Sequence, residues 1–317
     1  MGTYMQLKDI VKPRLRFRLN TNGVPNFLNR FDINQQYQVN IWNEKTYQVN
    51  PKTHVFTTIQ EHFGNRLIRN LKIPHQAVVI DLGCFIGEKL WQLKNNLNYL
   101  GVGVDIAISS LKIARKIDIY GHHFLAADME NLPFKNSCVD LVMVFDVIEH
   151  LSHAEKGFAE IARVLKPDGK LLLHIPIKDN KWSMFWWKQK LFPQAAFKDY
   201  ADVGHSPDRM LTRRQIKIYL EKYNLRIEKE IPYNVFLVHF WDREIVRVSA
   251  WLFSLLFRSG RTKSNVTRTL QTGYIGRTRE FYGRYLVPLL ELFSFPDWIF
   301  SYMGVGNTYF VVAAKRT

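Results

Sequence analysis

Residues 78–88 constrain the fold of this chain more than any other stretch; their sequence is Val-Val-Ile-Asp-Leu-Gly-Cys-Phe-Ile-Gly-Glu. Val78–Ile80 is short, apolar and β-branched, which favours a buried strand of a parallel sheet over a helix. Gly83 and Gly87 follow, and glycine permits backbone torsions and close approaches that a Cβ atom blocks. The stretch therefore predicts a strand, a tight turn and the start of a helix. A ligand can bind to the exposed amides of such a turn.

Strand-like and helix-like segments alternate after this stretch, which is typical of a parallel sheet covered on both faces. Further strands are expected at 100–104, 123–126, 139–145, 170–175, 225–231 and 308–314. Helices are expected at 87–97, 109–117, 153–165 and 212–223. A helix before the sheet is expected to begin at Asn50-Pro51, with Asn as the cap. The predicted fold class is α/β: a Rossmann-like, seven-stranded, mostly parallel sheet with helices on both faces.

Several motifs in a fixed order support a resemblance to a known family. After residues 78–88 they are Tyr99–Asp105, Ala126–Phe134, Cys138–His150 and Ala162–His174. Together they resemble the class I S-adenosylmethionine-dependent methyltransferases, in particular those of small-molecule or quinone type. The resemblance covers about residues 76–177 and, more weakly, 204–233. The family's first motif is usually Asp-x-Gly-x-Gly-x-Gly, and Phe85 stands here in place of its middle glycine.

The resemblance implies a site for the cofactor S-adenosyl-L-methionine. It places Asp105 on the ribose, Asp128 at the adenine amino group, and Ile106 and Met129 on the faces of the adenine ring. Asp81 would lie near the methionine end or order the amides of the turn. Asp105 and Asp128 are alternatively a helix cap and a turn residue. The predicted cofactor-binding residues are Asp81, Gly83, Cys84, Phe85, Gly87, Asp105, Ile106, Asp128, Met129 and Phe145.

Two histidines are the candidate catalytic residues on the acceptor side. The leaving group of a sulfonium methyl transfer is already activated, so positioning can supply much of the catalysis. A base is needed when the acceptor is a hydroxyl, an amine cation or a carbon acid. His150 follows the fourth strand with Asp146 and Glu149, and His205 lies in a Gly-His segment similar to one in many small-molecule methyltransferases. Packing or capping is the alternative role for both histidines. No metal site is expected, because the histidines do not cluster with Cys or carboxylates at ligand spacing.

The net charge and the segments after residue 180 indicate which kinds of partner the chain would bind. The chain has 44 basic and 28 acidic residues, a net charge of +16, which favours nucleic acid or an anionic membrane surface. Residues 181–192 are rich in Trp and Lys, and 241–258 show the pattern of a basic amphipathic helix, which favours a membrane interface. Residues 285–303 are apolar, but Pro and acidic residues interrupt them, so no spanning helix is expected. A helical lid in water is the alternative, and nucleic acid is the less favoured partner.

These features divide the chain into parts and suggest its function. Residues 1–75 would form an N-terminal extension with a helix over the cofactor, 76–233 the core, 234–306 a helical, membrane-associated lid, and 307–317 the last strand. We expect a methyltransferase for a small or amphiphilic acceptor such as a quinone, a lipid or a lipid-linked metabolite. The alternatives are an RNA-directed methyltransferase, suggested by the charge, and a non-catalytic methyltransferase-like subunit, suggested by Phe85.

The cysteines and the N-terminus suggest a compartment. Cys84 and Cys138 are the two cysteines of the chain, too few for a disulfide framework, which fits a reducing compartment. The N-terminal residues lack the apolar core of a signal peptide. A cytoplasmic location with peripheral association with membranes is expected.

Overall fold

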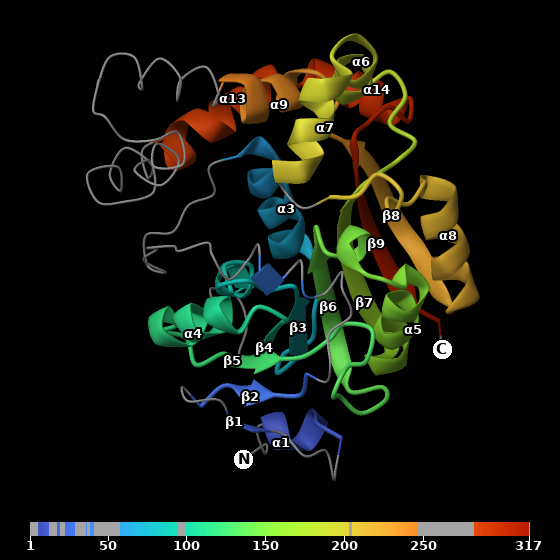
Figure 1. The fold of residues 1–317 in the computed structure, drawn as a ribbon. Helices are drawn as coiled ribbons and strands as arrows, with labels where there is room; N and C mark the ends of the chain where they lie inside the picture. Colours follow the sequence, from blue (N-terminus) through green and yellow to red (C-terminus); the bar gives the residue numbers. More distant parts are fainter. Residues whose placement is uncertain are drawn as a thin grey trace.

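A computed structural model gives the fold of the chain (Figure 1). It describes residues 6–12, 18–19, 23–28, 36, 39–40, 58–93, 99–202, 205–245 and 282–316. The centre is one sheet with the strand order β1-β2-β5-β4-β3-β6-β7-β9-β8. Its strands are β1 (Arg18–Leu19), β2 (Pro25–Asn26), β3 (Val78–Leu82), β4 (Leu100–Asp105), β5 (His123–Ala126), β6 (Val139–Phe145), β7 (Leu165–Pro176), β8 (Leu225–Tyr233) and β9 (Thr308–Lys315).

The sheet confirms the predicted fold class and corrects its strand count. Neighbouring strands from β5 through β4, β3 and β6 to β7 pair in parallel, and β9 lies antiparallel between β7 and β8. The seven strands from β3 to β9 are those that the sequence predicts. The sheet has nine because β2 adds to the edge at β5 and β1 pairs with β2. Arg18 and Leu19 of β1 end an alternation of basic and apolar residues from Arg14 that is typical of a strand, whereas the two residues of β2 are too few to show such a pattern.

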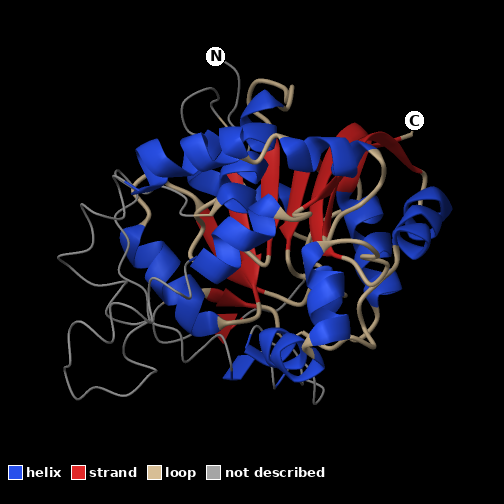
Figure 2. Ribbon diagram, turned by 90° about the horizontal axis from the view of Figure 1, so that it is seen from above, coloured by secondary structure: helices blue, strands red, loops and turns tan. Residues whose placement is uncertain are grey.

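Helices cover both faces of the sheet (Figure 2). They are α1 (Leu7–Ile10), α3 (Ile59–Asn70), α4 (Ile108–Ile117), α5 (Ala154–Val164), α6 (Met184–Leu191), α7 (Pro193–Asp202), α8 (Arg213–Lys222), α9 (Leu237–His239), α13 (Val287–Phe293) and α14 (Pro296–Tyr302), with shorter 3₁₀ or π turns η1 (Leu90–Leu93), η2 (Ile148–His150), η3 (Phe240–Ile245) and η4 (Tyr282–Leu286). Successive side chains of a strand point to opposite faces. Ile80 of β3 therefore packs in the cluster that includes α5 and α8, whereas Val79 packs in the cluster that includes α3 and α4.

One predicted helix is wrong, and two other helix predictions fall wholly or partly outside the described residues. The helix predicted at 87–97 is the short turn η1, because the glycine turn continues to residue 89; residues 94–98 lie outside the described part. The helix start predicted at Asn50-Pro51 lies outside the described residues. The described helix before the sheet, α3, starts at Ile59, where the Thr58 side chain accepts a hydrogen bond from the Glu61 amide. The predicted amphipathic helix at 241–258 lies outside the described residues beyond Ile245. The division into an extension, a core and a lid stays a prediction.

Helices α6, α7, α9, α13 and α14 form a layer that we call the helical cap, across the top of the sheet in Figure 1. Pro176 at the end of β7 and Tyr233 at the end of β8 both pair with Thr308 at the start of β9. Helix α6 follows β7, α9 follows β8, and α14 precedes β9, so the cap lies at the edge where the parallel strands end. Among the described helices, none is both long and apolar enough to cross a membrane.

Candidate functional site

The turn after β3 is tied to the end of β4. The amides of Gly83 and Cys84 donate to the Val104 carbonyl at 2.8 and 3.1 Å, and the Phe85 amide donates to Asp105 Oδ2 at 2.8 Å. The backbone has positive φ values of 70° at Gly83, 51° at Phe85 and 85° at Gly87. Alternate residues of the turn therefore take the left-handed conformation. This places the turn at the carboxyl ends of two adjacent parallel strands, where ligands bind in open α/β sheets.

Gly83 has a second reason to be glycine. A Cβ atom there would lie 2.2 Å from Val147 Cγ2, closer than any real contact. Phe85 is the exception in this turn, because it takes a left-handed torsion with a full side chain, at a cost of roughly 1–2 kcal/mol. Its side chain is half-buried and packs against the cluster around α3 and α4. The motif's middle position therefore keeps the torsion that favours glycine although Phe occupies it.

Asp105 closes the turn from the end of β4. Its Oδ2 accepts from the Phe85 amide and its Oδ1 accepts from the Ala107 amide, each at 2.8 Å. Burial raises the pKa of Asp105, and these two backbone hydrogen bonds oppose the rise. The carboxylate thus binds two backbone amides just before α4, but it does not cap that helix, whose N-cap is Ala107 without a side-chain hydrogen bond. Its ribose role stays a prediction.

Asp81 is a buried carboxylate that the protein satisfies only in part. It is 2% exposed, and its Oδ2 has no hydrogen-bond partner in the described part of the chain. Burial raises its pKa to about 7, although the positive charge of Lys89 acts in the opposite direction. Lys89, which the sequence analysis missed, lies with its Nζ 4.8 Å from the centre of the Phe145 ring. A buried carboxyl group with a raised pKa at the end of a strand, just before a glycine turn, is a candidate for a functional site.

The remaining predicted cofactor residues gather around the same edge. The Ala127 amide donates to the Asp105 carbonyl at 3.2 Å, so the loop that begins with Asp128 lies beside the end of β4. Asp128 Oδ1 accepts from the Glu130 amide at 2.8 Å, as a turn residue does. Met129 and Cys84 are each 5% exposed and pack within the core. Ile106, by contrast, is half-buried next to Asp105. Contact of these residues with a cofactor stays a prediction.

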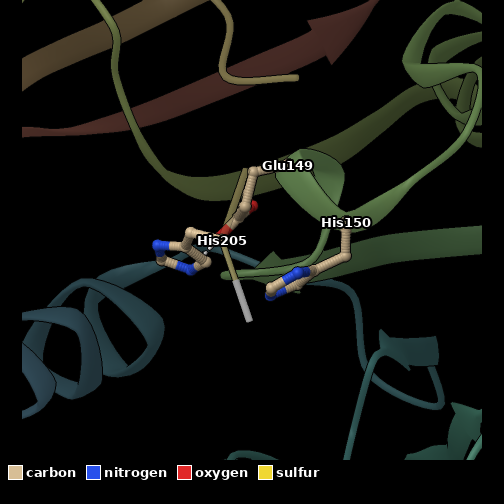
Figure 3. A group of neighbouring side chains, drawn as sticks. All are labelled: Glu149, His150 and His205. Atoms are coloured by element: carbon tan, nitrogen blue, oxygen red, sulfur yellow. Dashed lines mark ion pairs between the residues drawn. The ribbon is translucent and has the colours of Figure 1, made fainter. Parts of the chain in front are cut away.

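A second group of side chains lies after β6 (Figure 3). Glu149 and His150 belong to η2, and His205 comes from the connection between α7 and α8. His205 Nε2 lies 3.3 Å from Glu149 Oε1, and the two imidazole rings lie 5.0 Å apart between centres. Glu149 is 1% exposed, and neither of its carboxylate oxygens has a hydrogen-bond partner among the described residues. The fold thus brings together both predicted catalytic histidines and adds a buried acid.

Asp146 and His174 form an ion pair beside this group. His174 Nδ1 lies 3.1 Å from Asp146 Oδ1, and the Asp146 amide donates to the His174 carbonyl at 3.1 Å. Burial raises the pKa of Asp146, but the adjacent His174 outweighs it, and the pKa lies below its usual range. Sequence analysis named Asp146 and missed His174. The one signal for His174 in the sequence is that it is a polar residue near the end of an otherwise apolar strand.

Comparisons with known proteins agree with this geometry. Residues 80–173 match the model of a family described as a methyltransferase domain. The chain is 32% identical over 117 residues to malonyl-[acyl-carrier protein] O-methyltransferase of Marinomonas sp., covering 36% of this chain and 43% of that protein. It is 26% identical over 180 residues to demethylmenaquinone methyltransferase of Lactobacillus johnsonii, covering 51% and 73%.

A solved structure extends the likeness to the fold. Geranyl diphosphate C-methyltransferase from Streptomyces coelicolor, in complex with Mg2+, geranyl-S-thiolodiphosphate and S-adenosyl-L-homocysteine, aligns with a TM-score of 0.57 at 12% identity. The alignment covers 91% of this chain and 100% of that one. Matches to the first three curated relatives cover 54%, 44% and 43% of their length, so the chain spans about half of these relatives.

Proposed function

Residues 80–173 form a class I S-adenosylmethionine-dependent methyltransferase domain, and from this premise we propose that the chain methylates a small or amphiphilic acceptor. The observation that carries the proposal is the glycine turn, which meets Asp105 where β3 and β4 end. Positive φ values at Gly83, Phe85 and Gly87 give this turn the form of a ligand loop.

The residues present fit the cofactor. Asp81 offers a buried carboxylate oxygen without a partner, and Asp105 offers a carboxylate that the Phe85 amide can release to a ribose hydroxyl. When bound, S-adenosyl-L-methionine supplies a methyl group on a positively charged sulfur. A cation near Asp81 would lower the pKa of that carboxyl group again, since an opposite charge favours the ionised form. Asp128 and Ile106 would then define the adenine end.

The acceptor side is formed by Glu149, His150 and His205. His205 lies beside the Glu149 carboxylate and is half-buried, so it can receive a proton from an acceptor group. Glu149 would stabilise the imidazolium that forms. Glu149 and His150 follow β6, and His205 lies beside Glu149, so the group is at the same edge of the sheet as the glycine turn.

The helical cap supports an amphiphilic acceptor taken from a membrane surface. Many of its large apolar side chains are exposed: Trp187, Leu191, Phe197, Leu289, Leu292, Phe293, Trp298, Ile299, Phe300 and Tyr302. Exposed apolar side chains that lie together on a protein's surface usually mark a binding surface. The chain's net charge of +16 favours an anionic bilayer. The quinone substrate in the name of the relative from Lactobacillus johnsonii is of the same chemical kind.

Calorimetric titration with S-adenosyl-L-homocysteine tests the activity. We expect micromolar binding by the wild type and binding roughly 30- to 150-fold weaker for Asp105→Asn, because one charged hydrogen-bond acceptor is worth about 2–3 kcal/mol. Asp168→Asn, at an exposed position of β7 with φ 61°, is the matched control and should bind normally. Absence of binding by the wild type would overturn the proposal and favour a non-catalytic subunit.

Vesicle flotation tests the acceptor class. Wild-type protein should float with vesicles containing phosphatidylglycerol at low salt. A triple variant with Leu292→Ser, Phe293→Ser and Met303→Ser, which are 67%, 61% and 71% exposed, should not float. Ile119→Ser, at a 50% exposed position after α4, should behave as the wild type. RNA binding that falls steeply with salt, without flotation, would move the choice to an RNA acceptor.

A further inference from the structure

Within the described residues, one group of three side chains that can each donate a ligand atom to a metal lies close together: Glu149, His150 and His205. We propose that this group binds one divalent transition-metal ion on the acceptor side of the domain. The metal, rather than a free imidazole, would then activate an acceptor oxygen. This inference rests on the proposed methyltransferase function and narrows its acceptor to one with an ionisable oxygen.

The geometry of the group suits a small ion. The three ligand atoms all lie within 4.8 Å of one another. Ligands at about 2.0–2.2 Å from a tetrahedral ion lie roughly 3.4 Å apart, so the group is slightly wider than a filled site. His205 Nε2 and Glu149 Oε1 lie 3.3 Å apart, which is already close to the separation of two ligands on one ion. Turning the His150 ring by its side-chain torsions would bring in the third ligand (Figure 3).

The electrostatics of Glu149 point to a cation. Glu149 is 1% exposed, and its oxygens lack hydrogen-bond partners among the described residues even though His205 is near. An isolated buried carboxylate is strongly unfavourable unless a charge or a metal compensates it. Asp146 does not serve this purpose, because it is itself an acid and pairs with His174. A divalent ion between Glu149 and the two imidazoles would satisfy the carboxylate.

The donor set indicates which metal and what chemistry. Two imidazoles and one carboxylate suit Zn2+, Fe2+, Mn2+ or Co2+ better than Ca2+ or Mg2+, which prefer oxygen ligands. Three protein ligands leave a coordination position for an acceptor hydroxyl, whose pKa the ion would lower. The hydroxyl proton would leave to solvent. The oxygen lone pair would form the new O–C bond while the S–C bond of the sulfonium breaks and its electron pair stays on sulfur.

Metal binding by the untagged, EDTA-dialysed full chain tests the inference. Equilibrium dialysis against ZnSO4 or MnCl2 should find one tightly bound equivalent in the wild type. Glu149→Gln and His205→Gln should each weaken binding at least roughly 100-fold, since losing even an outer-shell partner costs 10- to 100-fold. His153→Gln is the matched control: its side chain is 60% exposed and pairs with Glu130, so metal binding should not change. The visible spectrum of a Co2+ complex gives a second readout.

Titration with S-adenosyl-L-homocysteine on the same samples separates the two proposals. Normal cofactor binding in Glu149→Gln shows that the variant is folded. If the wild type binds the cofactor but retains no metal, or if His205→Gln binds metal as well as the wild type does, the metal inference is overturned and the histidines return to the role of bases. If the wild type binds metal but no cofactor, the proposed function fails while the metal site stands.

Discussion

The glycine turn and the helical cap are both at the carboxyl edge of the sheet, but they are held together in different ways. In the turn, contacts join neighbouring strand ends: Gly83 and Cys84 donate to Val104, and Phe85 donates to Asp105, which is 20 residues away. These partners lie about twenty residues away, at the end of the adjacent strand. The positive φ values at Gly83 and Gly87 then shape the turn itself.

The cap depends on buried acids that join distant segments. Asp297 accepts from the amides of Phe236, Leu237 and Val238, about sixty residues earlier. Half-buried Asp242 of η3, which follows α9 of the cap, accepts from the first amides of α3, 182 and 183 residues away. Glu291 pairs with His62 and Arg66 of α3 at 2.7 and 2.6 Å. In the sequence, Glu291 and Asp297 only interrupted an apolar stretch, whereas in the fold they connect the cap to the rest.

This difference between the turn and the cap indicates how far the effect of a substitution should extend in each region. A substitution in the turn alters a structure that neighbouring residues define, so its effect should reach the cofactor site directly. A substitution of a cap acid removes a long-range connection, so it should loosen the cap while the turn keeps its form. Variants in the two regions test this contrast.

The largest effect is expected for Gly83→Ala in the turn. The new Cβ would lie 2.2 Å from Val147 Cγ2 at a φ of 70°, so both backbone strain and steric overlap arise. We expect about 4 kcal/mol lower stability, measured by urea unfolding, from roughly 1–2 kcal/mol of strain and 1–3 kcal/mol of overlap. Gly121→Ala is the matched control, because its φ is 80° but nothing lies within 4 Å of the new Cβ. Equal losses in both variants would show that the turn yields to the clash.

Asp297→Ala is expected to have the next largest effect, in the cap. It leaves three backbone amides at the start of α9 without their acceptor, and the residue is only 4% exposed. We expect a loss of about 3 kcal/mol and faster hydrogen exchange at residues 236–238, with S-adenosyl-L-homocysteine binding preserved. Asp9→Ala, which removes one exposed hydrogen bond to the Gln6 amide, should cost far less. Loss of cofactor binding in Asp297→Ala would mean that the cap and the turn are coupled.

The sheet was largely predictable because its strands are short apolar runs with clear ends. The bounds 123–126 and 139–145 match β5 and β6. The start of α3 was missed although Thr58 and Glu61 have the spacing of a capping box, which is a readable signal. The helix at 87–97 was wrong because propensity does not show that the turn continues past Gly87.

The residues of the candidate site also divide into those that the sequence could predict and those that it could not. Asp81, Gly83 and Asp105 could be named from local motifs, since the motif order fixes which strand ends are adjacent. The approach of His205 to Glu149 could not, because it depends on how α6 and α7 return the chain to the edge of the sheet. The burial of Glu149 without partners is also a tertiary property. Its sequence neighbours do not reveal it.

The pH dependence of stability should isolate Asp81. Its pKa of about 7 in the folded protein lies above the value of about 3.9 in the unfolded chain, so the folded state binds more protons between these values. The stability that Asp81 contributes is therefore full below about pH 4 and is lost as the pH rises through 7. Between pH 5 and pH 7 the loss should be about 2 kcal/mol. Urea unfolding of Asp81→Asn should lack this slope; parallel curves for the two proteins would contradict the prediction.

The smallest effect concerns the torsion at Phe85, and a pair of variants measures it. At a φ of 51°, Gly is free of the penalty that any side chain carries, so Phe85→Gly should be about 1 kcal/mol more stable than Phe85→Ala by urea unfolding. Both variants lose the same ring packing, which cancels in the comparison. At Lys116, exposed in α4, the order should reverse, because Ala is favoured over Gly in a helix by about 1 kcal/mol. If Ala is also favoured at residue 85, the turn has relaxed to a right-handed form. The left-handed torsion would then be a consequence of the Phe85 side chain rather than a requirement of the turn.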